Sequence, residues 1–382
     1  MTPLQWFRIF SSLGYVLFTS VTSTLTLLVP AVVLLRPLSS RLYARATSSI
    51  FAAWWTSCLF ITERLNGVSV RVTGDELPLN VPLLIMSNHK CNLDWMFLWS
   101  CAVRTGSLFH VGVFRAVAKR EIRTIPIFGW GCKLNGFAYV RRAWDRDVGH
   151  LTRWAGAQMR RRAPGWVLIF PEGTRYTDAN KARSDAARRR EGASELPGEI
   201  LRPRTKGLAL LLGENERHRY FGKVVDMTIQ YTDASGAPLA GSQLGTRCFG
   251  QLAKGELPVA TCHVHFETFD ARDVPVEPEE VARWCEIRWR RKAEMLAGLA
   301  RPGAVGYPGA KEWASSGGAV PFAKQTALRI LFTLQGLACV GCLTRSSAFA
   351  AYAVAAFAGL ARMCYLDPVS YTHLTLPTIL LV

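Results

Sequence analysis

The chain has 382 residues, of which 49% are hydrophobic and only 19% are charged, and its formal net charge is +18. This composition argues against an ordinary soluble domain and predicts a membrane protein whose basic surface binds anions. The sequence contains no zinc-finger spacing, no aromatic RNA-binding signature and no basic helix with heptads. We therefore expect membrane lipids and phosphorylated small molecules as partners, with no nucleic acid and no obligate protein partner.

Residues 1–63 are expected to form N-terminal membrane helices. No charged residue occurs between Arg8 and Arg36, which is long enough to span a bilayer, and Pro30 predicts a kink. A second apolar run, residues 48–62, is short and is expected to lie in the interface or to re-enter. The alternative is that both runs form a monotopic hairpin that is buried in one leaflet of the membrane. The basic connection between the runs predicts that it and the following domain face the cytosol.

Residues 64–303 are expected to form the catalytic domain. Apolar strands alternate with helical stretches, which predicts an α/β fold with a mostly parallel sheet flanked by helices. Residues 261–267 alternate like a further strand, which would place Cys262 on the opposite face from His263 and His265 and favours a structural role over a metal site. The basic run 178–200 is expected to be an exposed helix and loop. The other expected strands are residues 68–72, 82–86, 137–140, 166–170 and 224–231.

The C-terminal part divides into a linker, an apolar hairpin and a tail. Residues 304–325 are rich in Gly, Ser and Ala and are expected to be the linker. Residues 326–366 contain two apolar runs separated by Arg345, which predicts a transmembrane hairpin with Arg345 at its turn. Residues 369–382 resemble the translation of a sequencing adapter and are left out of the functional reasoning. The ten cysteines lack the spacing of a disulfide scaffold, so we expect them to be reduced.

The strongest local signal is the segment Ser87–Trp95, which follows the apolar strand 82–86. His89 and Asp94 are five residues apart and can touch at a strand end or at the mouth of a helix. An imidazole oriented by a carboxylate can remove a proton from an alcohol. No GxSxG motif occurs, so a substrate hydroxyl would be the nucleophile. Taken alone the pair is weak evidence, because a helix-capping Asp and a surface His would give the same pattern.

A second signal, residues 170–175, follows the apolar strand 166–170. Gly173 lets the backbone approach a ligand, Thr174 offers a hydroxyl, and Arg175 offers a planar fork suited to phosphate. Two such loops at one sheet edge would form a site where α/β folds place their ligands. Lys119 and Arg142 are cations near the ends of expected strands or helices. The sequence is equally consistent with two roles for them, binding a phosphate or remaining as exposed surface charges.

Together these segments resemble the glycerolipid acyltransferase family. Its NHxxxxD motif corresponds to Asn88–Asp94, its GxxFIxR motif to Gly136–Arg142 with Tyr and Val in place of Phe and Ile, and its EGTR motif to Glu172–Arg175. Residues 201–207 resemble the LPRTKG stretch of eukaryotic 1-acylglycerol-3-phosphate acyltransferases of the gamma, delta and epsilon kind. The fourth motif is usually a strand with Val-Pro, and residues 224–230 lack this proline.

The resemblance implies a role for each matched position. His89 would be the general base with Asp94 as its partner, and the reaction would acylate 1-acylglycerol-3-phosphate with acyl-CoA as co-substrate, without metal, cofactor or covalent enzyme intermediate. Another lysophospholipid such as lysocardiolipin, or a non-catalytic membrane-shaping role, are the alternatives. The resemblance also implies an integral protein of the endoplasmic reticulum. The residues implied to bind glycerol phosphate are Lys119, Arg142, Glu172, Gly173, Thr174 and Arg175.

Overall fold

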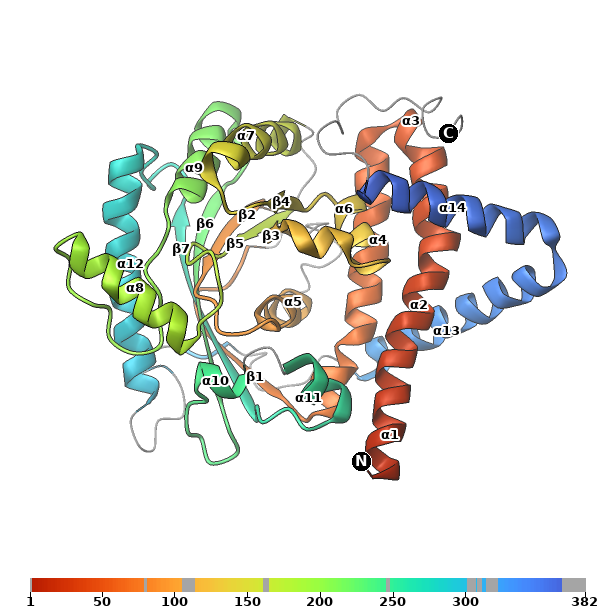
Figure 1. The fold of residues 1–382 in the computed structure, drawn as a ribbon, viewed down its shortest axis with the longest axis horizontal. Coiled ribbons are helices and arrows are strands. Elements are labelled where there is room, and N and C mark those ends of the chain that lie inside the picture. The colour runs from red at the N-terminus through yellow and green to blue at the C-terminus, as the bar shows by residue number, and fades with distance from the viewer. Residues whose placement is uncertain are drawn as a thin grey trace.

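The computed structural model describes residues 2–78, 81–104, 114–160, 165–244, 248–300, 307, 311–313 and 322–365. The tail 369–382 and most of the expected linker therefore lie outside the described residues. Figure 1 shows an α/β domain on one side and a group of apolar helices on the other. The expectation of a mostly parallel sheet flanked by helices, with apolar helices at both ends of the chain, is confirmed.

The first helix runs from Pro3 to Leu38 and is long and apolar enough to cross a membrane. π-helical turns lie on both sides of Pro30, which has no N–H to donate to the preceding turn. The segments are α1 (Pro3–Ile9), a π-helical turn (Phe10–Gly14), α2 (Tyr15–Ser23), two further π-helical turns (Thr24–Leu28 and Ala31–Leu35) and α3 (Arg36–Leu38).

The second N-terminal helix, α4 (Ser40–Cys58), begins eight residues before the apolar run expected from the sequence. The Ser39 side chain accepts the N–H of Leu42 and so caps its first turn. Trp54 Nε1 donates to Thr19 Oγ1 at 2.9 Å, which joins α4 to the first helix. The two helices therefore pack as a hairpin, and a π-helical turn (Ile61–Leu65) leads into the sheet.

The sheet has seven strands in the order β1-β7-β6-β2-β5-β3-β4. Only the β6–β7 pair is antiparallel. All of the strands expected from the sequence are present, and the structure contains one further strand, β3, that the sequence did not predict. The strands are β1 (Ser69–Gly74), β2 (Leu83–Ser87), β3 (Phe114–Lys119), β4 (Ala138–Val140), β5 (Trp166–Ile169), β6 (Lys223–Thr232) and β7 (Thr261–Asp270).

Helices cover both faces of the sheet and enclose a core on each. One core packs α4 and α5 against the sheet, and the other packs α7, α9 and α12 against the opposite face (Figure 1). The helices of the domain are α5 (Asp94–Arg104), α6 (Phe128–Leu134), α7 (Trp144–Arg160), α8 (Asp178–Arg190), α9 (Lys206–His218), α10 (Gly241–Leu244), α11 (Cys248–Lys254) and α12 (Pro278–Leu299), with a 3₁₀ turn at Arg120–Thr124.

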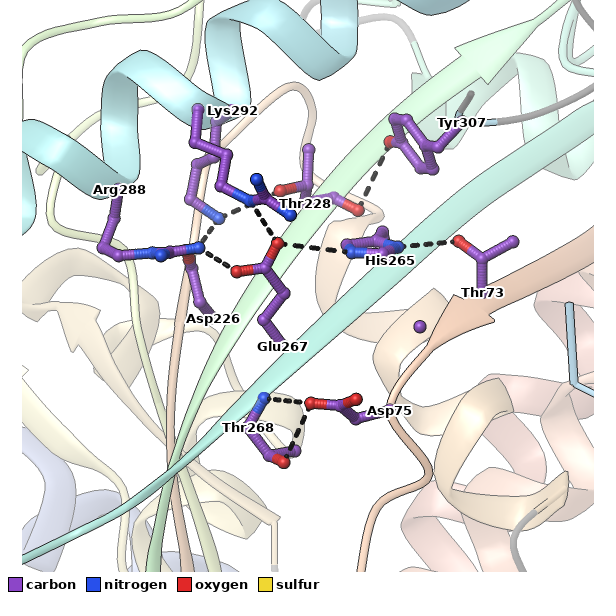
Figure 2. Close-up of polar contacts among 12 residues, drawn as sticks. Thr73, Asp75, Asp226, Thr228, His265, Glu267, Thr268, Arg288, Lys292 and Tyr307 are labelled. Carbon is purple, nitrogen blue, oxygen red and sulfur yellow. Dashed lines mark hydrogen bonds and ion pairs between the residues drawn. The ribbon is translucent and has the colours of Figure 1, made fainter. Parts of the chain in front are cut away.

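A buried charge cluster fastens α12 to β6 and β7. Asp226 and Glu267 are paired across the two strands, and Arg288 Nε donates to Asp226 Oδ2 at 3.0 Å (Figure 2). Arg288 also pairs with Glu267, and the buried Lys292 pairs with Asp226. Removing one partner of such a cluster typically costs about 3–5 kcal/mol. Asp226 belongs to β6, the strand that lacks the proline of the fourth family motif. Because proline has no backbone N–H, its absence lets every residue of β6 keep an N–H for hydrogen bonds to its neighbours.

The basic run expected to be a solvated face is partly buried. It forms the expected helix, α8, but the Arg188 side chain is only 4% exposed. Its two terminal nitrogens donate to the carboxylate of Glu286 on α12 at 2.9 and 2.7 Å. Its Nε donates to the carbonyl of Ser194 at 2.6 Å. The expectation fails here because this arginine has a bidentate partner 98 residues away along the chain.

Two apolar helices form the C-terminal part, as expected, and they are longer than the apolar runs; their crossing of a membrane stays a prediction. α13 (Phe322–Arg345) starts inside the expected linker and ends at Arg345, and α14 (Ser347–Tyr365) follows. The residues Lys324–Arg345 are apolar and long enough to cross a membrane. Their turn lies away from the first helix, and from it the two helices diverge as they run back toward the N-terminal helices (Figure 1). Gln335 donates to Thr26, and Tyr352 Oη donates to the Leu25 carbonyl at 2.6 Å, so both helices contact the first helix.

Candidate functional site

Four parallel strands bring the sequence motifs to one edge of the sheet. β2, β5, β3 and β4 are neighbours in that order, so their carboxyl ends lie along the same edge. The first motif follows β2, the second follows β5, and Lys119 and Arg142 stand at the ends of β3 and β4. This is the edge at which α/β sheets bind ligands. The expectation that the two loops meet is confirmed, because Arg175 Nη1 donates to Asn92 Oδ1 at 3.0 Å.

His89 and Asp94 are in direct contact. His89 Nδ1 lies 2.7 Å from Asp94 Oδ2, and the Asp94 side chain is fully buried while His89 remains 17% exposed. A buried carboxylate accepts a hydrogen bond from the N–H at Nδ1, which leaves Nε2 as the nitrogen that can take a proton from a ligand. Asp94 is also the first residue of α5, where a negative charge is favoured by the helix dipole.

Three further donors hold the Asp94 carboxylate. The backbone N–H groups of Lys90 and Cys91 donate to it at 2.7 and 3.1 Å, so the loop wraps around the carboxylate. Tyr231 Oη donates to Asp94 Oδ1 at 2.6 Å from the middle of the sheet. Burial raises the pKa of Tyr231 well above its usual value, so the phenol stays protonated and remains a donor. Tyr231 could not be identified from the sequence, because it lies 137 residues from Asp94 and no motif contains both residues.

The loop and the imidazole ring are fixed from both sides. Asn88 Nδ2 donates to the Ile229 carbonyl at 3.0 Å, and its Oδ1 accepts the Ile229 N–H at 2.9 Å, which attaches the loop to β6. The ring of His89 stacks on Phe170, with centroids 4.0 Å apart. The N–H of Tyr176 donates to the His89 carbonyl at 2.7 Å. The base is therefore held in place before any ligand binds.

The second motif forms a tight turn whose residues point to different sides. Gly173 has a positive φ of 67°, a conformation that favours glycine, and its N–H donates to the Phe170 carbonyl at 2.9 Å. Gly173, Thr174 and Arg175 line a cavity above the turn. Asn180 of α8 donates to Thr174 Oγ1 at 3.3 Å, which orients that hydroxyl.

Glu172 is buried within this turn and does not line the cavity. Its side chain is 2% exposed, and burial raises its pKa to about 8, although the backbone N–H groups of His89 and Leu201 oppose the shift. A buried carboxyl that joins the two loops can position them. Its expected contact with phosphate stays a prediction, and its placement favours a supporting role.

Arg142 projects from a strained turn at the end of β4. Its φ is 61°, in the left-handed region that arginine rarely adopts. The Asp147 carboxylate accepts the N–H of Arg141 at 2.8 Å and of Ala143 at 3.0 Å, so both neighbours of Arg142 are pinned. Partial burial lowers the pKa of Arg142, the nearby Glu121 carboxylate opposes this shift, and the nearby charges of Arg204 and Arg175 add to it. Such a group gains from an anionic ligand.

Of the site residues expected from the sequence, all except Glu172 and the buried Asp94 line one cavity of about 1610 Å³. One wall is apolar and aromatic. In it Trp55 of α4 packs edge to face on Trp95, with their ring centroids 4.5 Å apart. The other wall is cationic and includes Arg202, Arg204 and Lys206 of the segment 201–207, to which the motif match assigned no role. The apolar wall includes Phe51, Trp55, Trp95, Phe114, Phe128 and Phe137, and the cationic wall includes Lys119, Arg142, Arg175, Arg202, Arg204 and Lys206.

The residues considered as metal ligands belong to a strand. β7 places Cys262 in one core and His263 and His265 on the other face, as expected. Among the described residues, no group of three His, Cys, Asp or Glu side chains could hold a metal ion. His265 instead contacts Thr73 Oγ1 at 3.0 Å and lies 3.6 Å from Glu267 (Figure 2).

Comparison with known proteins gives consistent matches. The family model described as Acyltransferase matches residues 69–215. A lysocardiolipin acyltransferase 1 of Danio rerio is 30% identical over 282 residues, which are 74% of this chain and 69% of that protein. The Mus musculus protein of the same name is 30% identical over 254 residues, 66% of this chain and 64% of its own length. A probable 1-acyl-sn-glycerol-3-phosphate acyltransferase 5 of Arabidopsis thaliana is 29% identical over 266 residues, 69% and 66% respectively.

The chain thus spans about two thirds of the length of the relatives that it matches. The region matched by the family model extends from β1 into α9 and contains every site residue expected from the sequence. The sequence motifs, the sheet edge on which they meet and the extent of these matches lead to one conclusion: the chain belongs to the glycerolipid acyltransferase family.

Proposed function

We propose that the chain transfers a fatty acyl group from acyl-CoA to the free hydroxyl of 1-acylglycerol-3-phosphate and so forms phosphatidic acid. The observation that carries the proposal is the 2.7 Å contact between His89 Nδ1 and Asp94 Oδ2 in a cavity with one apolar and one cationic wall. An acyl chain and a phosphate are the two chemical parts that a lysophospholipid presents to such walls.

In the proposed reaction the acceptor hydroxyl is the nucleophile. Its oxygen attacks the thioester carbon while His89 Nε2 takes its proton, and Asp94 stabilises the resulting imidazolium. The C–S bond then breaks, and the thiolate of CoA takes the proton back from His89. The products are an ester and CoA, so the reaction needs neither a covalent enzyme intermediate nor a cofactor.

The phosphate of the acceptor would bind Lys119, Arg142 and Arg175 of the cationic wall, and Arg175 is already oriented by Asn92. Arg202 of the same wall is not assigned to the phosphate, because its guanidinium already pairs with Glu191. The second acceptor to consider is a lysocardiolipin, because two of the relatives are named as lysocardiolipin acyltransferases. Both acceptors use the same proton transfer and differ only in the headgroup.

We also place the protein in the endoplasmic reticulum membrane, with the catalytic domain facing the cytosol. The two apolar helices support membrane association, and Arg36, Arg41 and Arg45 follow the first of them in the positive-inside sense. The nine cysteines whose side chains the structure describes are free, which is compatible with the reducing cytosol.

The test measures acyl transfer in membranes that contain the chain, with labelled acyl-CoA and a panel of lysolipids. His89→Ala should lower the rate by about 10²–10⁴ because the general base is lost. His218→Ala, on the outer helix α9 and outside the cavity lining, is the matched control and should keep full activity. Label in phosphatidic acid supports the acceptor named here, whereas label in another phospholipid changes the acceptor and keeps the mechanism. Near-normal turnover by His89→Ala would refute the mechanism.

A further inference from the structure

We propose that Arg204 is a third phosphate-binding arginine, and that it acts with Arg142 and Arg175 to select an acceptor whose headgroup is a phosphomonoester. This inference rests on the proposed acyl transfer and adds to it a residue that distinguishes monoester from diester headgroups.

Arg204 lies directly over the turn that carries the second motif. Its backbone N–H donates to the Pro171 carbonyl at 2.6 Å. Its Cδ lies 3.4 Å from the position that a Cβ on Gly173 would occupy, and its Nε and Nη1 lie 3.9 Å from the same point. The side chain therefore lies in van der Waals range of the glycine, and both residues line the cavity. The positive φ of Gly173 is what favours glycine here, because a Cβ would only touch Arg204 at an ordinary contact distance.

The three arginines form a cationic cluster. Partial burial lowers the pKa of Arg142, the Glu121 carboxylate raises it, and the positive charges of Arg204 and Arg175 lower it, so both of these arginines lie near enough to Arg142 to repel it. Within the part of the chain that the structure describes, none of the three forms an ion pair with a carboxylate. An anionic ligand would relieve this repulsion.

Arg202 shows the contrast within the same segment. It lies two residues earlier and also borders the cavity, but its guanidinium pairs with the carboxylate of Glu191. Its charge is therefore largely compensated within the protein. Arg204 and Arg202 have the same side chain and nearly the same place in the chain, and they differ in whether a carboxylate already binds them.

The cluster suits a headgroup with two negative charges. A phosphomonoester carries about −1.5 to −2 charges near pH 7 and presents three acceptor oxygens. A phosphodiester carries one charge and has two such oxygens. Guanidinium groups bind phosphate oxygens through paired N–H donors, and three of them match a monoester better than a diester. Arg204 should therefore contribute more to binding 1-acylglycerol-3-phosphate than to binding a diester lysolipid.

The experiment compares Arg204→Gln with the matched control Arg202→Gln in the full chain. Initial rates are measured with 1-acylglycerol-3-phosphate and with lysophosphatidylglycerol, a diester, at saturating acyl-CoA. We expect Arg204→Gln to lower kcat/KM about 10- to 100-fold for the monoester, chiefly through KM, and less than about threefold for the diester. Arg202→Gln should change both values less than about threefold. Equal losses with both acceptors, or no loss with the monoester, would overturn the inference.

A binding measurement separates this inference from the proposed function. Added 1-acylglycerol-3-phosphate should raise the thermal midpoint of the wild type and of Arg202→Gln in detergent, but not that of Arg204→Gln. This readout needs no turnover, so it supports or overturns the phosphate site even for a protein that transfers no acyl group. A wild type that acylates the acceptor and an Arg204→Gln variant with the same midpoint shift would leave the function standing and remove the role of Arg204.

Discussion

The substitution Glu172→Gln tests whether the buried carboxyl of the second motif supports the site or binds phosphate. Burial raises the pKa of Glu172 from 4.5 to about 8, so the native group is largely protonated at neutral pH. Glutamine has the same shape and no charge. Because Oε1 has no hydrogen-bond partner among the described residues, the substitution breaks no described bond at that atom. We expect turnover and the acceptor KM to change little, since Glu172 does not line the cavity.

The main effect of Glu172→Gln should appear in the dependence of stability on pH. Between pH 4.5 and pH 8 the native carboxyl binds its proton, whereas the unfolded carboxyl is ionised. The stabilisation from this site is therefore complete below pH 4.5 and declines by about 1.4 kcal/mol per pH unit as the pH rises toward 8. The whole decline is on the order of 5 kcal/mol. Glutamine does not titrate and should not show it.

The assay is thermal unfolding in detergent micelles, followed by tryptophan fluorescence at several pH values. Groups that titrate in both proteins cancel when the wild-type midpoint is subtracted from that of the variant. The difference between the two midpoints should move in favour of Glu172→Gln by about 6–13 °C between pH 5.5 and pH 8.5. The expected change in stability is about 3 kcal/mol, and about 1 kcal/mol corresponds to about 2–4 °C in a domain of this size. A difference that stays constant over this range would show that the carboxyl is ionised throughout and would refute the reasoning.

Three other changes test separate parts of the structure. Tyr231→Phe removes the 2.6 Å hydrogen bond to Asp94 and should lower kcat about 5- to 30-fold with little change in either KM; an unchanged kcat would contradict its role in holding Asp94. Asp226→Asn weakens the cluster that anchors α12 and should reduce the free energy of unfolding by about 3–5 kcal/mol in denaturant titration, and a loss below 1 kcal/mol would show that the cluster adds little. Trp55→Ala opens the apolar wall and should lower kcat/KM more for long-chain than for short-chain acyl-CoA, and equal losses would place the acyl chain elsewhere.

The sequence predicted those parts of the structure that depend on short stretches of chain. Runs such as residues 82–86 and 166–170 are apolar throughout, as buried parallel strands require, and both are strands. β3 was missed because Arg115 is its second residue and Lys119 its last, which interrupts the apolar pattern. Arg115 is nevertheless buried, so the tertiary environment overrides the local preference.

The same distinction explains which site residues could be found. His89 and Asp94 belong to one loop, so their spacing alone allows the contact that the structure has. Tyr231 is 137 residues from Asp94 and reaches it only because β6 lies beside β2 in the sheet. Glu172 and Gly173 are adjacent, and only the conformation of the turn decides that one lies behind the wall and the other lines the cavity. Their order in the motif does not contain that information.

The N-terminal helices show the clearest limit of dividing a chain by composition. Residues 1–63 were expected to be anchors and residues 64–303 to be the catalytic domain, yet Phe51 and Trp55 of α4 line the cavity beside His89. Each methylene moved from a lipid environment into water costs about 0.8 kcal/mol. A catalytic cavity whose apolar wall is part of a membrane-associated helix would let a long acyl chain reach the base without that transfer. The proposed reaction therefore gives a physical reason why the anchor and the active site share residues.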